Sequence, residues 1–294
     1  MEPGRCRLCH TETDLHASHI IPSFVHRWIK KDGPTPFLRL NDAPNKRRQD
    51  GIKRYWLCTD CEQRLSDFER EFATDIFHPT IAKGVHRITY GRWLLKFCTS
   101  LSWRALLMTA EHYGFATWPE PHKSRAPLAL ETWRRFLLGE IEHPGEFVQH
   151  LLVFTPWSEA GDDVPRNINH YLQIAIELDI ALGPDIGNTY VKFGPFIILG
   201  FFLLRWPGEW RTSRISLKQG SIAGGKYLLP GAFRGHLFER ARGHAALYKD
   251  ISPQQKSIIS EAWAKDADRI KDSRTWQVLQ LDLALFGDEA LGVY

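Results

Sequence analysis

The stretch "CRLC" at residues 6–9, matched by "CTDC" at residues 58–61, decides the fold of the N-terminal part of this chain. Two residues between paired cysteines let both thiolates reach one tetrahedral ion, and two such pairs complete a shell of four thiolates. We therefore predict a structural Zn²⁺ bound by Cys6, Cys9, Cys58 and Cys61. A closed shell leaves no open coordination position, so this zinc is expected to stabilise the fold rather than to catalyse. A thioredoxin-like redox pair is the weaker alternative, because the first pair does not lie in a strand-helix-strand pattern.

The cysteine count and the N-terminus predict a protein of a reducing compartment. The chain has five cysteines, and the fifth, Cys98, lies in a helical pattern where it is expected to be a small buried apolar residue. The N-terminal sequence "MEPGRCRLCH" lacks the apolar stretch of a signal peptide. The longest apolar run, residues 193–206, is too short to span a bilayer and predicts a buried strand. We expect a cytoplasmic protein with no membrane segment.

Composition indicates a globular protein whose excess positive charge is local. Hydrophobic residues make up 43% of the 294 residues and charged residues 24%, with a formal net charge of +4. Residues 1–60 contain 11 Lys or Arg against 7 Asp or Glu, whereas the remainder contains 27 of each. A basic surplus beside a zinc module is what binding to a phosphate backbone requires, although a solvated, mildly basic face is the alternative.

The pattern along the chain predicts an α+β protein with two units. Residues 1–80 form a small zinc-binding module with a short strand, "KRYWLC", followed by an amphipathic helix over residues 59–77, in which Leu65, Phe68 and Phe72 recur at helical spacing. Residues 85–294 form a larger α+β domain. Its expected parts are a helical region over 90–145, antiparallel strands over 168–230 and C-terminal helices over 232–285. The alternation in "HYLQIAIELDIAL", His170 to Leu182, predicts a half-buried strand.

The order of three motifs resembles a known family. "CRLC" is followed by "SHIIP" at residues 18–22, then by a variable loop and "LCTDCE" at residues 57–62. This order is similar to that of zinc-stapled HNH endonucleases, which have the ββα-metal or treble-clef fold. The resemblance covers about the first 75 residues and implies a metal-dependent endonuclease that hydrolyses phosphodiester bonds, in DNA for preference, in a bacterial defence or mobile-element setting.

The resemblance also implies roles for particular residues. His19 matches the general base that activates a water, and imidazole suits this role because its ordinary pKa lies near neutral pH. Glu62 matches the closing ligand of a catalytic Mg²⁺ or Mn²⁺, and Asn45, or Asn41 as a second choice, matches the asparagine that helps to orient the base. The residues expected to contact the nucleic-acid backbone are Arg47, Arg48, Lys53 and Arg54.

One departure from the family pattern bears directly on catalysis. The family has Asp or His just before the base, as a metal ligand, and this chain has Ser18, which is a poor ligand for a divalent cation. His16 is a candidate replacement, but along a regular strand it shares a face with Ser18 and not with His19. It could take that place only if the backbone bulges there.

The serine at position 18 leaves other functions open. The module could be a catalytically inactive zinc unit that binds nucleic acid or a protein partner, in which His19 is a structural group and Glu62 an ordinary first-turn carboxylate. In a third hypothesis, the C-terminal domain senses a ligand or a protein partner, and the zinc module only supports it.

Overall fold

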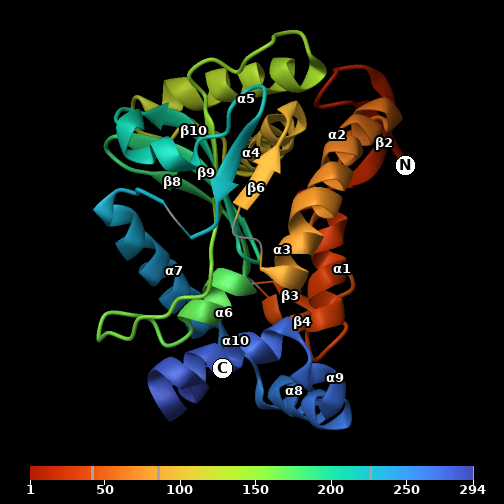
Figure 1. Ribbon diagram of the computed structural model, residues 1–294. Coiled ribbons are helices and arrows are strands. Elements are labelled where there is room, and N and C mark those ends of the chain that lie inside the picture. Colours follow the sequence, from red (N-terminus) through yellow and green to blue (C-terminus); the bar gives the residue numbers. More distant parts are fainter. Residues whose placement is uncertain (41–42, 85–86, 226, 294) are drawn as a thin grey trace.

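The computed structural model describes residues 1–40, 43–84, 87–225 and 227–293, and it combines helices with antiparallel sheets (Figure 1). This arrangement confirms the predicted α+β class. The N-terminal unit, red and orange in Figure 1, lies beside a four-stranded sheet that has helices on both faces. None of the helices in the described ranges is long and apolar enough to cross a membrane.

The N-terminal unit is built on a three-stranded antiparallel sheet in the order β1-β2-β5. Its strands are β1 (Glu2–Arg5), β2 (Glu12–His19) and β5 (Lys53–Leu57). The β2–β5 register is irregular between His16 and Ala17, as in a β-bulge. As a result Leu15 and Ser18, three residues apart, are both buried, so the simple two-residue alternation along β2 does not hold.

Two parts of this unit differ from the sequence-based expectation. Residues 33–51, expected to be a loop, contain two short antiparallel strands, β3 (Leu38–Leu40) and β4 (Ala43–Arg48). The helix α2 (Thr59–Phe72) does not end before "HPT", because it continues through a π-helical turn (Ala73–Phe77) into α3 (His78–Lys83). Pro79 lies in the first turn of α3, where a missing backbone N–H is tolerated.

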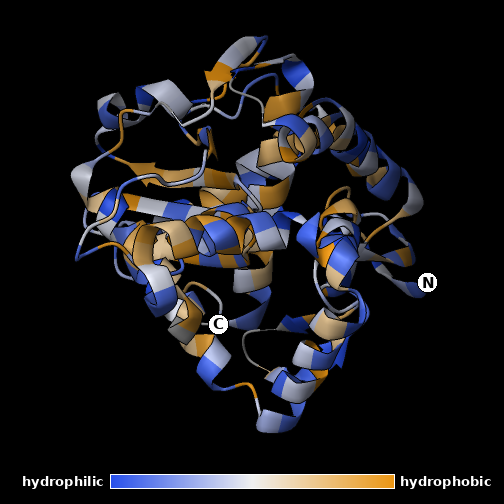
Figure 2. Ribbon diagram, turned by 60° about the horizontal axis from the view of Figure 1, so that its bottom comes forward, coloured by the Kyte–Doolittle hydropathy of each residue, from blue (hydrophilic) through white to orange (hydrophobic). Residues whose placement is uncertain are grey.

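The larger sheet has the strand order β7-β10-β9-β8, with every neighbouring pair antiparallel. Its strands are β7 (Gln149–Val153), β8 (Ile176–Leu182), β9 (Ile186–Phe193) and β10 (Phe196–Leu204). Side chains such as Leu151, Val191 and Ile198 face one hydrophobic cluster, and Leu152, Tyr190 and Ile197 face another. Both faces of this sheet are therefore covered, and Figure 2 shows hydrophobic residues concentrated on its strands.

Helices cover the sheet, and a short β6–β11 pair completes the fold. The helices α4 and α5 lie against one face, while α6 and α7 contribute to the cluster on the other face. The remaining elements are β6 (Arg87–Tyr90), α4 (Arg92–His112), α5 (His122–Leu138), α6 (Ile168–Gln173), a 3₁₀ turn (Pro207–Ser213), β11 (Gly220–Ala223), α7 (Gly231–Lys249), α8 (Pro253–Lys265), α9 (Ala267–Lys271), α10 (Arg274–Phe286) and a final 3₁₀ turn (Gly287–Val293).

The predicted strand over His170–Leu182 is wrong in its first part, because residues 168–173 form α6 and the strand begins only at Ile176. The reason is a tertiary contact, since the Asp282 carboxylate of α10 accepts hydrogen bonds from the backbone N–H groups of Asn169 and His170 at 2.9 and 3.0 Å. These bonds satisfy two donors at the start of a helix. The strand β7 lies outside the region where strands were predicted.

The hydrophobic core runs across the boundary predicted near residues 80–85. Phe24 of α1 (Ser23–Asp32) and Phe72 of α2 contact Phe193 of the larger sheet, at ring-centroid distances of 6.4 and 5.9 Å. A single cluster of buried side chains contains all three residues. The N-terminal unit and the larger sheet therefore stabilise each other by burying a common apolar surface.

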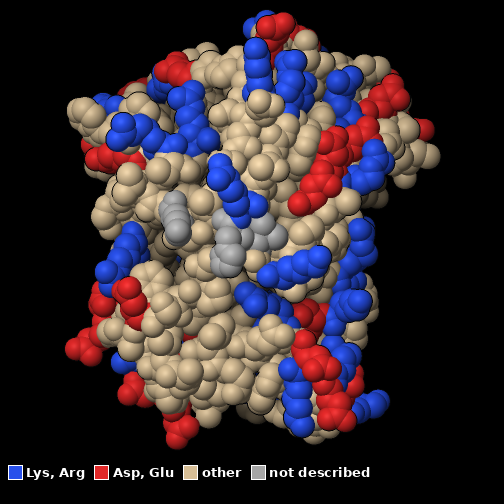
Figure 3. Space-filling view, in the orientation of Figure 1, with Lys and Arg blue, Asp and Glu red and all other residues tan. Residues whose placement is uncertain are grey.

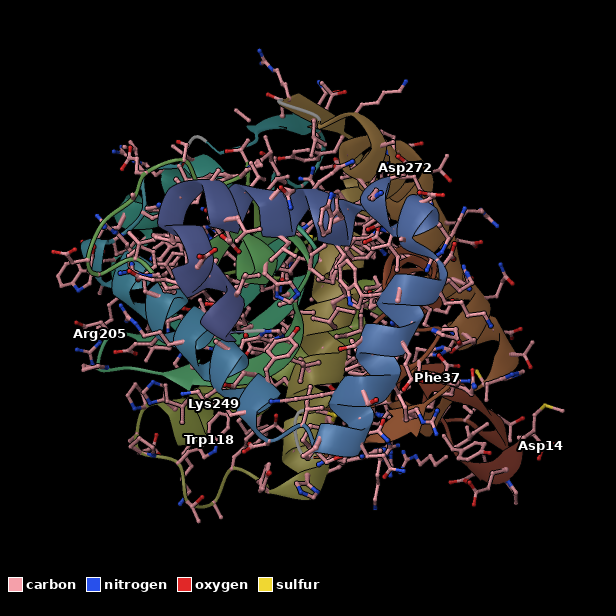
Figure 4. The ribbon with its side chains drawn as sticks, turned by 90° about the horizontal axis from the view of Figure 1, so that it is seen from below. Asp14, Phe37, Trp118, Arg205, Lys249 and Asp272 are labelled. Atoms are coloured by element: carbon pink, nitrogen blue, oxygen red, sulfur yellow. The ribbon has the colours of Figure 1, made fainter. Side chains whose placement is uncertain are left out.

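The C-terminal helices form hydrogen bonds with the N-terminal unit. The Asp32 carboxylate, at the end of α1, accepts hydrogen bonds at 2.8 Å from the backbone N–H groups of Arg274 and Thr275 at the start of α10. Arg269 donates to the carbonyl oxygens of Lys31 and Gly33 at 2.8 and 3.2 Å. Figure 4 shows the C-terminal helices crossing the lower face beside the segment that carries Phe37.

Candidate functional site

The four predicted zinc ligands lie together. The Sγ atoms of Cys6, Cys9, Cys58 and Cys61 are all within 4.8 Å of one another, and those of Cys9 and Cys58 are 3.7 Å apart. A tetrahedral ion with Zn–S bonds of about 2.3 Å separates its sulfur ligands by about 3.8 Å, so the cluster fits such an ion. None of the five cysteines is in a disulfide. This group could therefore hold a metal ion such as zinc.

Local backbone structure brings the cysteines to this place. Cys6 and Cys9 lie in the turn between β1 and β2, which is closed by hydrogen bonds from His10 N to Cys6 O and from Cys6 N to Thr11 O, both of 2.9 Å. His10 has φ of 65°, a left-handed conformation that the tight turn requires. Cys58 and Cys61 lie at the start of α2, where the helix dipole favours thiolates.

Neighbouring groups stabilise this cluster further. The backbone N–H of Cys58 donates to Cys6 Sγ at 3.5 Å, and a hydrogen bond with the Cys61 thiol lowers the pKa of the Cys6 thiol to about 4. Thiolates are the form that binds metal. His16, the candidate replacement ligand, forms a 3.0 Å hydrogen bond with Thr59 Oγ1 beside this cluster. The structure thus associates His16 with the start of α2 through Thr59, and the hydrogen bond of Glu62 on this side is with Ser18.

His19 lies at the end of β2 and pairs with an acidic residue that sequence reasoning missed. Its Nε2 atom is 2.8 Å from Asp50 Oδ1, and the two side chains are 19% and 39% exposed. A carboxylate can only accept a hydrogen bond, so Nε2 is the donor, and in the neutral form of the ring Nδ1 bears the lone pair. The pair is thus oriented and open to solvent, as a general base must be.

Asp50 is held by three donors. Besides His19, Lys53 Nζ lies 2.7 Å from its Oδ2, and the backbone N–H of Gly51 donates to its Oδ1 at 2.9 Å. Burial alone would raise the pKa of the Asp50 carboxyl, but the hydrogen bonds from Lys53 and His19 hold it well below its usual range. Asp50 is therefore ionised at neutral pH and can accept all three hydrogen bonds.

Ser18, directly before His19, points to a different partner. Its Oγ donates a 2.5 Å hydrogen bond to Glu62 Oε2, and the residue is only 1% exposed. The two positions that bind the catalytic ion in HNH-like enzymes therefore contact each other directly. Glu62 is half-buried in the first turn of α2.

The donors around Glu62 do not fit the expected catalytic Mg²⁺ or Mn²⁺ site. Such ions are bound by several oxygen ligands, usually including one or two carboxylates. Within the described ranges, the four-cysteine cluster is the one group of three or more His, Cys, Asp or Glu side chains that could hold an ion. Glu62 accepts a hydrogen bond from the Ser18 hydroxyl, while His19 is hydrogen-bonded to Asp50. Ser18 and Glu62 together therefore offer too few oxygen ligands for such an ion.

The expected role of Asn45 is also corrected. Its Nδ2 donates to Asp250 O at 2.9 Å, and its Oδ1 accepts from Ser252 N at 2.7 Å. Both ends of the amide thus join β4 to the junction of α7 and α8, and Asp50 is the residue that orients His19. Asn41, the second choice, lies outside the described residues.

The basic residues predicted to contact nucleic acid differ in their partners within the protein. Arg47 lies over the ring of Phe37, 5.2 Å from its centroid, and it is exposed like Arg48 and Arg54. Lys53 is half-exposed but forms the ion pair with Asp50. On the face drawn in Figure 3, Lys and Arg are interspersed with Asp and Glu and do not form one continuous basic field. Arg47, Arg48 and Arg54 are therefore the exposed arginines of the predicted set.

Two residues of this site, Asp50 and His26, were not predicted from the sequence. Asp50 and Gly51 form an Asp-Gly pair just before β5, and Lys53 lies opposite His19 in the β2–β5 register. An Asp-Gly pair between strands is a turn signal, so a turn at Asp50 could have been predicted from the sequence. The second residue, His26 of α1, has its ring centroid 5.8 Å from that of His19. No spacing rule predicts that contact.

Comparison of the chain with protein-family models, with curated proteins and with solved structures finds no match. The fold and the site thus define a class only by their own features. They describe an α+β protein with an N-terminal four-cysteine cluster that could hold a metal, and with a histidine-aspartate pair at the end of the neighbouring strand.

Proposed function

We propose that this protein is an endonuclease, in which the N-terminal module hydrolyses phosphodiester bonds of nucleic acid, with DNA as the first substrate to test. The observation that carries the proposal is the 2.8 Å contact between His19 and Asp50, beside a four-cysteine cluster and three exposed arginines. The order of the motifs around His19, which resembles that of HNH endonucleases, supports the same reaction class.

The proposed chemistry uses His19 as the general base. Nδ1, the nitrogen not bonded to Asp50, takes a proton from a water molecule while that water attacks the phosphorus atom. As the new P–O bond forms, the P–O bond to the leaving oxygen breaks, and that oxygen takes a proton from solvent water. The imidazole becomes positively charged, and the ionised Asp50 carboxylate stabilises this charge and keeps the ring in one orientation. Arg47, Arg48 and Arg54 are the side chains available to hold the backbone of the nucleic acid.

The zinc of this proposal has a structural role. When bound, it would be closed in by Cys6, Cys9, Cys58 and Cys61 and would fix the start of α2 against β2. His19 lies at the far end of that strand. The four cysteines therefore set the position of the strand that carries the base, and they take no part in proton transfer.

A cleavage assay tests the proposal. Plasmid DNA and a structured RNA are incubated with the protein, with Mg²⁺ or Mn²⁺ and without either, and product formation is compared for wild type and His19→Ala. We expect a loss of about 10²–10⁴-fold in rate for His19→Ala. His112→Ala, a substitution at an exposed histidine near the end of α4, is the matched control and should cleave like wild type. No cleavage by wild type, or equal cleavage by His19→Ala, would refute the proposal.

The 2.5 Å hydrogen bond between Ser18 and Glu62 favours a second candidate, a non-catalytic zinc module that binds nucleic acid. It predicts gel-shift binding without cleavage. In either case, removal of two phosphate contacts in Arg47→Ala/Arg48→Ala should weaken binding and reduce its salt dependence. A double variant with unchanged affinity and unchanged salt slope would show that β4 is not a phosphate contact.

A further inference from the structure

A cavity lies between the N-terminal unit and the larger sheet, next to the proposed base. Its volume is about 290 Å³, close to the lower end of the range for small-ligand sites. Its walls come from the residues directly after β2, from α1, β3, the residues directly before β5, α4 and β8. The apolar lining residues are Ile20, Ile21, Leu38, Ile52, Met108, Ile176 and Leu178. The cavity therefore has apolar walls of the kind that bind a flat, weakly polar group.

His26 is the most buried polar side chain in the lining. It is 6% exposed, and neither ring nitrogen forms a hydrogen bond of ordinary geometry within the described residues, with the Ile21 backbone as a weak neighbour. Burial, with a smaller contribution from His19, lowers the pKa of His26 to about 4, so the ring is neutral at pH 7. A neutral imidazole offers one donor and one acceptor. Leaving both unused inside a protein is unfavourable, and a ligand with complementary groups would remove this cost.

Two charged groups also border the cavity. Arg39 donates from Nη2 to Gln255 at 3.2 Å, while its Nε is buried without a partner among the described residues. Glu177 accepts a 2.7 Å hydrogen bond from Tyr171 and pairs with Arg240 at 3.0 Å. The lining thus includes an unused donor and a largely neutralised carboxylate, and Arg39 is the one Lys or Arg among the lining residues, so the lining does not suit a phosphate.

Some residues that line the cavity are direct sequence neighbours of the proposed catalytic pair. Ile20 follows His19 directly, and Gly51 follows Asp50, so both catalytic residues are next to lining residues. Gly51 must be a glycine because a Cβ there would lie 2.0 Å from His26 Nε2. A nucleotide whose phosphate lies at His19 would therefore have its base within reach of this cavity.

We propose that this cavity binds one nucleobase of the nucleic-acid substrate, turned out of the stack, with His26 and Arg39 contacting its polar edge. The inference rests on the proposed function for its substrate class. Enzymes that act on an extruded nucleotide recognise its base by hydrogen bonds to the base edge and by apolar contacts on its faces. The apolar walls and the unused nitrogen groups of His26 and Arg39 supply both kinds of contact.

Calorimetric titration with nucleoside 5′-monophosphates tests this directly, because it needs no cleavage. The four ribonucleotides and the four deoxyribonucleotides are titrated into the full-length protein, and ribose 5-phosphate serves as the ligand without a base. We expect at least one nucleotide to bind with a dissociation constant below about 1 mM, and ribose 5-phosphate to bind at least tenfold more weakly. Equal binding of ribose 5-phosphate, or no nucleotide binding, overturns the proposal.

Two variants localise the binding to the cavity. Met108→Trp fills it from α4, away from His19, and should weaken nucleotide binding about tenfold or more, whereas His112→Ala, on the same helix but outside the lining, should bind like wild type. His26→Leu removes both unsatisfied nitrogens, so it should weaken binding about tenfold with no fall in the midpoint of thermal unfolding. Unchanged binding in both Met108→Trp and His26→Leu overturns the proposal.

The outcomes separate this inference from the proposed function. Nucleotide binding lost in Met108→Trp, in a protein that cleaves no substrate, would support the pocket and refute the nuclease. Cleavage that depends on His19, without any nucleotide binding in the cavity, would support the nuclease and refute the pocket.

Discussion

At the scale of single residues, two neighbours on one strand contact different partners. Ser18 and His19 are consecutive at the end of β2, so their side chains leave opposite faces of the strand. Ser18 is buried against Glu62 of α2, and His19 faces Asp50 before β5. A change of residue type at position 18 therefore acts on the contact with the helix and leaves the histidine-aspartate pair on the other face.

Gly51 provides a residue-scale prediction. A methyl group at this position would meet the buried His26 ring at 2.0 Å, and that ring has little freedom to move. We expect Gly51→Ala to lower the free energy of unfolding by about 1–3 kcal/mol, measured by urea denaturation. In the double variant Gly51→Ala/His26→Ala the clash is absent, so Gly51→Ala should cost much less on the His26→Ala background. Equal costs on both backgrounds would contradict this account of the contact.

The sequence allowed some of these residues to be predicted but not their partners. Spacing to both cysteine pairs indicated His19, and the four cysteines do lie together. Asn45 was expected to orient the base because it lies in the right interval, yet its amide is taken by the chain at residues 250 and 252. Spacing limits which residues can meet, but contacts with distant parts of the chain decide which of them do.

At the scale of elements, the cysteine cluster ties a turn to a helix. It joins the β1–β2 turn to the start of α2, and the packed residues behind it include Leu8 and Trp56 of the N-terminal unit and Trp103 of α4. The rings of Trp56 and Trp103 are 6.4 Å apart, and Trp56 Nε1 donates to Glu111 at 2.8 Å. Loss of the cluster should therefore disturb α4 as well as the N-terminal strands.

Metal removal tests this arrangement. Folded protein should contain about one equivalent of zinc by elemental analysis, and a zinc chelator, or the substitution Cys9→Ser, should lower the midpoint of thermal unfolding and change the tryptophan emission. Cys98→Ser, at the buried cysteine of α4 outside the cluster, should keep the full zinc content. Folded wild-type protein with less than about half an equivalent of zinc would contradict a structural metal.

Elements with strong local signals were predictable, and those set by tertiary contacts were not. The helix after Cys58 and the capped helix α8, where Ser252 accepts from Gln255 N and Pro253 opens the first turn, follow from local pattern. The helix α6 does not, because its first N–H groups are satisfied by Asp282 from the other end of the chain. Alternation between polar and apolar residues fits a strand and a short helix about equally well over six residues.

At the scale of the whole molecule, the two ends of the chain meet around the proposed site. Asp32 and Asn45 of the N-terminal unit bond to the C-terminal helices, and Phe24 shares a cluster with the larger sheet. The proposed pocket has walls from both parts. Residues beyond 85 thus contribute to the site, which the sequence resemblance, limited to the first 75 residues, could not indicate.

Buried histidines give the whole molecule a predictable response to acid. Burial lowers the pKa of His244 to about 4 and that of His150 to about 3, as it does for His26. In the unfolded chain these groups have a pKa near 6.5, so below that pH the unfolded state binds protons that the folded state excludes. The free energy of unfolding should therefore fall from about pH 6.5 to about pH 4, by about 1.4 kcal/mol per pH unit for each of these histidines.

Denaturation curves at pH 7, 6 and 5 measure this slope. His150→Gln should reduce the slope by about 1.4 kcal/mol per pH unit below pH 6.5, because one of the buried groups is gone. His143→Gln, at an exposed histidine, is the control and should leave the slope unchanged. Stability that stays constant or rises between pH 7 and pH 5 would contradict the neutral, buried state of these rings.

The most direct test of the proposed function is a double-mutant cycle on the histidine-aspartate pair, read as the rate of nucleic-acid cleavage. The four proteins are wild type, His19→Ala, Asp50→Asn and the double variant. If Asp50 acts only through His19, Asp50→Asn alone should lose roughly 10²-fold, and the double variant should be no slower than His19→Ala. A double variant slower by the product of the two single losses, or a wild type that cleaves nothing, would contradict the account.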